Sequence, residues 1–124
     1  SVNETAARFG ITDREAAAAF EELHRRHALF LEPNTHDIRM ANPFSGVETS
    51  FKVLAKGKTY FANCAWDSFG IPAALHMDAH IEAACSQSAD AIHVNIKDGQ
   101  VSRSDVLIHF LVPFHAWYND LVFT

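Results

Sequence analysis

The chain has 124 residues, enough for one domain or for one core with a small appended module. Its composition, 48% hydrophobic and 20% charged, is that of a globular protein, and no apolar run approaches the roughly 20 residues that span a bilayer, which excludes a membrane span. The formal net charge of -5 argues against a phosphate-binding surface as the main function.

Two helices and a hairpin are predicted at the start of the chain. Asn3 can cap a short helix over residues 4–9, which Gly10 would end. Thr12 begins a capping-box pattern, and the apolar stripe after it predicts a second helix to about Arg26. Residues 28–32 and 37–40 flank turn residues and predict a β-hairpin. These elements predict a winged-helix-like module over residues 1–42.

A winged-helix-like module raises the question of DNA binding. The second predicted helix carries four acidic and three basic side chains, which is a poor face to lay on phosphates. These are Asp13, Glu15, Glu21 and Glu22 against Arg14, Arg25 and Arg26. We therefore expect no nucleic-acid partner, and a winged-helix regulator stays as an alternative.

Residues 43–124 form the second predicted unit. Strands at 49–55 and 58–63 flank Lys56-Gly57 as a hairpin, which leads into a helix over residues 65–76 that Pro72 can split in two. Further strands are predicted at 80–84, 91–97 and 106–112, with a type I′ turn at Asp98-Gly99 and the apolar last strand central to the sheet. The predicted fold class is α+β, with the winged-helix-like module packed on a mostly antiparallel sheet with flanking helices.

The segment Asn63-Cys64-Ala65-Trp66-Asp67 carries the strongest chemical signal. If a helix begins there, Cys64 lies at its N-terminus and Asp67 lies one turn on, facing the same way. The helix dipole should then lower the pKa of the Cys64 thiol and favour the thiolate, which binds soft metals. A buried structural cysteine beside a capping aspartate is the alternative interpretation.

Three segments carry a resemblance to a known family: residues 42–47 (Asn-Pro-Phe-Ser-Gly-Val), residues 60–72 around Cys-Ala-Trp-Asp, and residues 80–85 (His-Ile-Glu-Ala-Ala-Cys). From about Leu29 onward the chain resembles the alkylmercury (organomercurial) lyases, which cleave carbon–mercury bonds by protonolysis with two cysteines, an aspartate and no cofactor. The resemblance implies that Cys64 is the mercury-binding thiol, Asp67 the proton shuttle and Cys85 a structural thiol. It also implies a winged-helix-like module packed against the catalytic part.

The expected partner is a small organomercurial substrate, with mercury as part of the substrate and product and no separate cofactor. Trp66, between Cys64 and Asp67, would give an aromatic wall suited to an apolar organic group. A non-catalytic module that binds mercury or another soft metal is the alternative. The absence of a signal-peptide pattern and the two cysteines in unlike surroundings predict a cytoplasmic protein, and its oligomeric state stays open.

The chain stops at Thr124 on an apolar run, and the resemblance would place a second catalytic cysteine immediately after it. We expect a chain truncated before its second thiol, and one hypothesis is a UGA codon for selenocysteine taken as a stop. Such a chain should bind mercury with slow or absent protonolysis.

Eight histidines make a metal site the rival chemistry. His76 and His80 have i,i+4 spacing, but a turn between them should point the rings apart, whereas His93 and His109 could meet across the sheet. Neither pair has the short Cys/His spacing of structural zinc, so histidines at the surface or in the core are the favoured interpretation.

Overall fold

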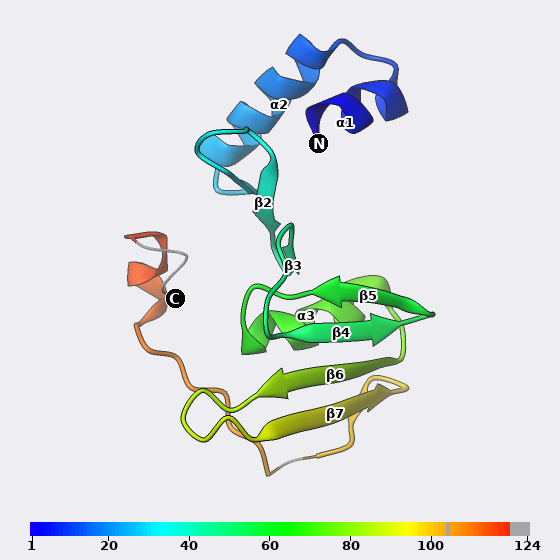
Figure 1. Cartoon of the computed structure of the whole chain (residues 1–124), viewed down its shortest axis with the longest axis vertical. Coiled ribbons are helices and arrows are strands. Elements are labelled where there is room, and N and C mark those ends of the chain that lie inside the picture. Colours follow the sequence, from blue (N-terminus) through cyan, green and yellow to red (C-terminus); the bar gives the residue numbers. More distant parts are fainter. Residues whose placement is uncertain (104, 120–124) are drawn as a thin grey trace.

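The computed structural model describes residues 1–103 and 105–119, and Figure 1 shows their arrangement. Helices α1 (Val2–Phe9) and α2 (Asp13–Arg25) each begin with a capping box, Ser1 with Glu4 and Thr12 with Glu15. The predicted cap Asn3 was wrong, since Ser1 and Glu4 satisfy the first backbone amides two residues earlier. Gly10 ends α1 in the left-handed conformation with φ 65°, as predicted.

A small antiparallel sheet follows the two helices. It has the order β1-β2-β3, formed by β1 (Phe30–Leu31), β2 (Ile38–Ala41) and β3 (Phe44–Ser45). Its last strand lies beyond the predicted module boundary at residue 42, and Phe44 bridges to Ala62 just after β5, which joins this part of the chain to the larger sheet. The helices and the small sheet are the elements that a winged-helix-like module needs, and the winged-helix arrangement itself stays a prediction.

The larger sheet has five antiparallel strands in the order β5-β4-β6-β7-β8, with helix α3 (Ala65–Leu75) lying across one face (Figure 1). The strands are β4 (Lys52–Ala55), β5 (Lys58–Phe61), β6 (Ala79–Ala84), β7 (Ala91–Lys97) and β8 (Gln100–Val101). The predicted α+β class is confirmed. Pro72 does not split α3, in which it is buried.

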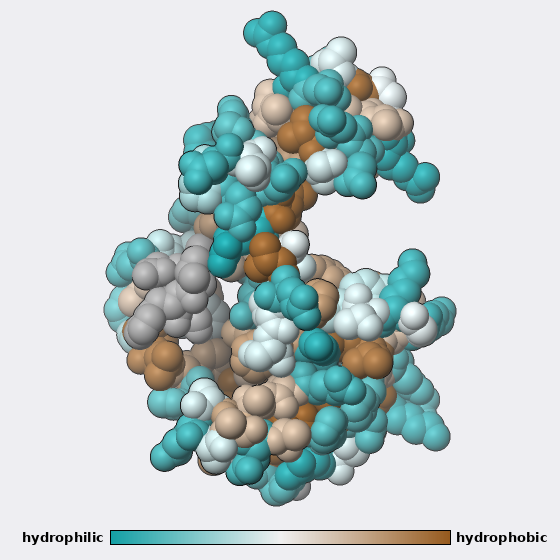
Figure 2. Space-filling model, in the orientation of Figure 1, coloured by the Kyte–Doolittle hydropathy of each residue, from teal (hydrophilic) through white to brown (hydrophobic). Residues whose placement is uncertain are grey.

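The hydrophobic core lies between α3 and the sheet. Val53, Ile81 and Val94 point inward from three adjacent strands and pack with Ile71 of α3, all with at most 2% of their surface exposed. Since successive side chains of a strand point to opposite faces, the residues between them face away from the helix. On the face shown in Figure 2, hydrophilic side chains cover much of the surface.

The predicted central strand over residues 106–112 was wrong. Strand β6 takes the central position, and its two edges already pair with β4 and β7, while β7 pairs outward with β8. With the central position filled, residues 106–112 form no strand, and Leu107 is 95% exposed. This segment leads to the 3-10 helix η1 (Phe114–Asn119).

No helix among the described residues is long and apolar enough to cross a membrane. The expectation about Thr124 falls outside the described residues.

Candidate functional site

Cys64 is the N-cap residue of α3, as predicted. Strand β5 ends at Phe61, and two residues later the extended backbone of Cys64 (φ -150°, ψ -179°) gives way to the helix. Asp67 lies in the first turn of the same helix. The Asn63–Asp67 segment therefore places a thiol and a carboxylate on one side of the helix start.

The thiol and the carboxylate line one cavity of about 80 Å³. Its polar lining includes Asn42 and Asn63, and its apolar lining includes Met40 of β2 and the predicted wall residue Trp66. The C-terminal segment supplies four more lining residues, which are Ile108, His109, Phe110 and Trp117. Segments that lie far from Cys64 in the sequence thus form part of the cavity wall.

Burial raises the pKa of the Cys64 thiol, contrary to the predicted lowering. The backbone amides of Asp67 and Trp66 favour the thiolate, as expected at a helix start, although neither makes a cap hydrogen bond to Sγ that satisfies ordinary geometric limits. Desolvation is the largest effect, and the negative charge of Asp67 adds to it. Cys64 therefore stays a protonated thiol until a ligand such as a soft metal binds the sulfur and replaces the proton.

Burial also raises the pKa of Asp67. The hydrogen bond from the Asn63 side chain and the nearby Cys64 thiol lower it, but their effects are smaller than that of desolvation. The carboxylate and the thiol line the same cavity, so a proton has a short path from sulfur to oxygen.

Asn63 was missed as a site residue by the sequence reasoning. Its Nδ2 donates to Asp67 Oδ2 at 3.0 Å and to Asn42 Oδ1 at 3.0 Å, while its buried Oδ1 has no protein partner. Asn42 and Asn63 both lie inside the segments that carry the family resemblance, and this position is the feature of the sequence that could have identified them as site residues.

Aromatic rings form the far side of the cavity. Trp66 lies tilted against Phe110 with ring centroids 6.2 Å apart, and Phe110 stacks on Trp117 at 5.4 Å. Trp117 Nε1 donates to the carbonyl of Val112 at 2.9 Å, which holds the indole in place. The wall that was expected from Trp66 alone is built from three rings.

Cys85 does not line this cavity. It follows β6 in the turn toward β7, where the nearby Ser88 side chain and the backbone amides of Ser88 and Gln87 lower the pKa of its thiol. Both cysteines are free thiols. A structural role for Cys85 stays a prediction.

A second hollow of about 450 Å³ lies between the end of α3 and the β7–β8 turn. His76 and Asp78 contribute to its lining, but neither cysteine does. The reactive groups of the chain therefore meet in the smaller cavity.

Comparisons with known proteins point to one family. A family model described as alkylmercury lyase matches residues 44–123. A crystal structure of the mercury-bound form of MerB2 is similar with a TM-score of 0.66 and 22% sequence identity, over 85% of this chain and 50% of that chain. The present chain thus spans about half the length of that protein, and the likeness shows a shared fold. No curated protein matches the chain.

Proposed function

The chain belongs to the alkylmercury lyase family, and from this premise we propose that it cleaves carbon–mercury bonds by protonolysis in the cavity beside Cys64. The observation that supports the proposal is that Cys64 and Asp67, one helical turn apart at the start of α3, line one small cavity. No cofactor enters the scheme, because mercury is part of the substrate and of the product.

The first step is capture of the organomercurial cation R–Hg⁺ by sulfur. Mercury is soft, and thiolates are the protein ligands that soft metals prefer. As the S–Hg bond forms, the S–H bond of Cys64 breaks and its proton moves to the Asp67 carboxylate. The raised pKa of Cys64 keeps this proton in place beforehand, and the raised pKa of Asp67 helps the carboxylate to take it.

The second step is protonation of carbon. Asp67, now a carboxylic acid, gives its proton to the mercury-bound carbon, and the electron pair of the C–Hg bond becomes the new C–H bond. The hydrocarbon R–H leaves, and Hg²⁺ stays on the Cys64 sulfur. The Trp66, Phe110 and Trp117 rings would hold an apolar R group close to Asp67.

Mercury left on one thiolate needs a second soft ligand before it can leave. Within the described residues the other cysteine, Cys85, lies outside the cavity, and a small thiol from solution can supply that ligand. We therefore expect added thiol to accelerate turnover.

Incubation of the chain with phenylmercury, with and without added thiol, tests the proposal. Benzene is measured by gas chromatography and protein-bound mercury by mass spectrometry. Cys64→Ser should lose mercury retention at the cavity and all benzene release, whereas Asp67→Asn should keep the mercury and lose the benzene. Cys85→Ser is the matched control and should behave as the unmodified chain.

Two outcomes would count against the proposal. Equal retention of mercury by the Cys85→Ser chain and by a chain that also carries Cys64→Ser would refute the role of Cys64. Mercury bound at Cys64 without any benzene, even with added thiol, would instead support the non-catalytic binding module.

A further inference from the structure

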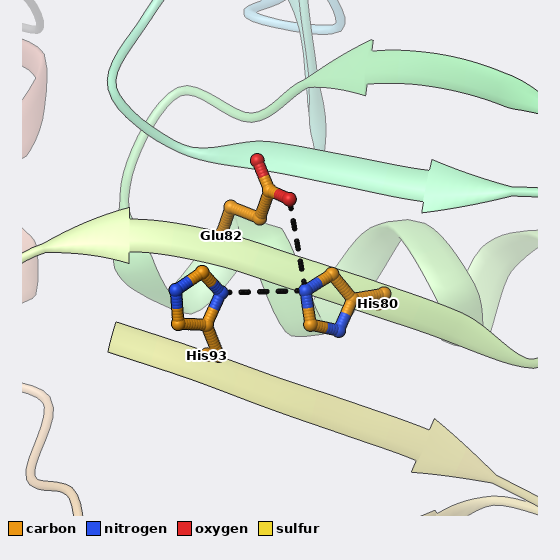
Figure 3. Close-up of side chains that lie close together, drawn as sticks. All are labelled: His80, Glu82 and His93. Carbon is orange, nitrogen blue, oxygen red and sulfur yellow. Dashed lines mark hydrogen bonds and ion pairs between the residues drawn. The ribbon is translucent and has the colours of Figure 1, made fainter. Parts of the chain in front are cut away.

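Three side chains with metal-binding atoms meet on the outer face of the larger sheet (Figure 3). His80 and Glu82 are two residues apart on β6, and His93 stands directly opposite Glu82 on β7. They alternate with the buried Ile81 and Val94, so they point away from α3 and from the hydrophobic core. The predicted pairing of His93 with His109 was wrong, because His109 lines the Cys64 cavity.

The distances between these atoms suit a common ligand. His93 Nδ1 lies 3.3 Å from His80 Nε2, and His80 Nε2 lies 3.7 Å from Glu82 Oε1. All three atoms lie within 4.8 Å of one another. A tetrahedral zinc ion with bonds of about 2.0–2.1 Å separates its ligand atoms by about 3.3–3.4 Å. The histidine pair already has this separation, and Glu82 needs only a small side-chain rotation.

Asn95 orients the His80 ring toward the other two. It stands opposite His80 on β7, and its Oδ1 lies 2.7 Å from His80 Nδ1. An amide oxygen only accepts, so Nδ1 carries the proton and donates it, which leaves the lone pair on Nε2. A metal-binding histidine commonly has such a partner on its other ring nitrogen.

Among the described residues, Glu82 forms no ion pair with a lysine or an arginine. The Nε2 lone pair of His80 faces both His93 and the Glu82 carboxylate, and a proton shared between the two rings would leave the carboxylate without a partner in the cluster. Lys52 is opposite Glu82 on β4, but its ammonium group lies 3.9 Å from Glu48. A divalent cation would satisfy both nitrogens and the carboxylate at once.

We propose that His80, Glu82 and His93 bind a divalent transition-metal ion of the zinc class, with water in the fourth position. Imidazole and carboxylate are ligands that zinc accepts, whereas mercury prefers thiolate, so this site and the Cys64 cavity select different metals. Its ligands come from two adjacent strands, so the ion ties β6 to β7. The proposal does not depend on the lyase activity.

The test is a calorimetric titration of the full chain with zinc chloride, carried out in a Cys64→Ser, Cys85→Ser background so that thiols cannot bind the metal. One zinc ion per chain is expected. Glu82→Gln and His93→Gln should each weaken binding at least tenfold, and Asn95→Ala roughly tenfold to a hundredfold.

His36→Asn is the matched control. It removes an exposed histidine from the β1–β2 turn, at a positive φ of 56° that asparagine tolerates, and should leave zinc binding unchanged. Circular dichroism checks that each variant is folded, and zinc should shift the ring nitrogen resonances of His80 and His93 in NMR spectra. Unchanged affinity in folded His93→Gln, or no saturable binding up to about 1 mM zinc, would overturn the proposal.

Discussion

The side-chain amide of Asn63 donates to the Asp67 carboxylate at 3.0 Å, and the same nitrogen also donates to Asn42 at 3.0 Å. One amide therefore fixes the carboxylate relative to the segment that precedes β3. Its hydrogen bond stabilises the ionised form of Asp67 and opposes the effect of burial.

Asn63→Ala should therefore raise the pKa of Asp67 further, because burial would act without this opposing bond. The carboxyl carbon resonance of Asp67, followed by NMR against pH, measures the change. Asn42→Ala is the control, since it leaves the bond from Asn63 to Asp67 intact and should shift the pKa less. A pKa that is unchanged or lower in Asn63→Ala would show that the bond does not hold the carboxylate.

The pH dependence of stability should also report the burial of Asp67. Its folded-state pKa lies above the ordinary value of 3.8, so between these two values the folded state binds more protons than the unfolded state. This contribution to stability is present at low pH and is lost as pH rises through the raised pKa. Asp67→Asn removes the buried charge and should raise the melting temperature at neutral pH by a few degrees. Thermal unfolding of the unmodified chain and of Asp67→Asn is measured across this pH range. A difference in melting temperature that does not change with pH would show that Asp67 makes no such contribution.

Cys85 should react faster with an alkylating reagent than Cys64, although Cys64 is the proposed mercury-binding thiol. Burial raises the pKa of Cys64, whereas the Ser88 side chain and nearby backbone amides lower the pKa of Cys85. Alkylation requires the thiolate, so brief treatment with iodoacetamide near neutral pH should modify Cys85 first. Peptide mapping by mass spectrometry gives the order. Faster modification of Cys64 would mean that the helix dipole outweighs desolvation at that site.

Trp66 should affect ligand choice more than folding. It is 57% exposed and contacts Phe110 across the cavity, so its removal costs little buried surface. If the proposed function holds, Trp66→Ala should weaken the retention of phenylmercury by roughly two- to tenfold, which is the value of one aromatic pair. Methylmercury lacks a ring and should be retained as before. Equal losses for both compounds in competition experiments would argue against a role for the wall in selectivity.

Gly70 marks a close approach between α3 and the start of β3. A Cβ at this position would lie 2.9 Å from Cβ of Pro43, a rigid ring carbon. Overpacking of this kind costs about 1–3 kcal/mol, which exceeds the gain of about 1 kcal/mol from replacing a helical glycine. Gly70→Ala should therefore lower the free energy of unfolding in urea.

Ala74→Gly, at an exposed position of the same helix, measures the helix-propensity effect alone for comparison. A gain in stability for Gly70→Ala would show that Pro43 can move away from α3.

Local signals in the sequence were enough for most elements. Capping patterns located α2, the Lys56-Gly57 and Asp98-Gly99 turns located the hairpins, and the cysteine and carboxylate in Cys64-Ala65-Trp66-Asp67 were correctly expected on one side of the helix start. These features depend on neighbours within about one turn of helix or one hairpin, and such neighbours are visible in the sequence itself.

Tertiary structure decided what depends on distant neighbours. The pairing of both β6 edges excluded residues 106–112 from the centre of the sheet, and Phe110 instead lines the Cys64 cavity. The same residues leave Cys64 half-buried, and the desolvation outweighs the helix dipole that the sequence suggested. Strand register likewise brings His93 to His80, because β6 and β7 pair residues that lie many positions apart in the chain. Burial and register are properties of the assembled sheet, and no local pattern encodes them.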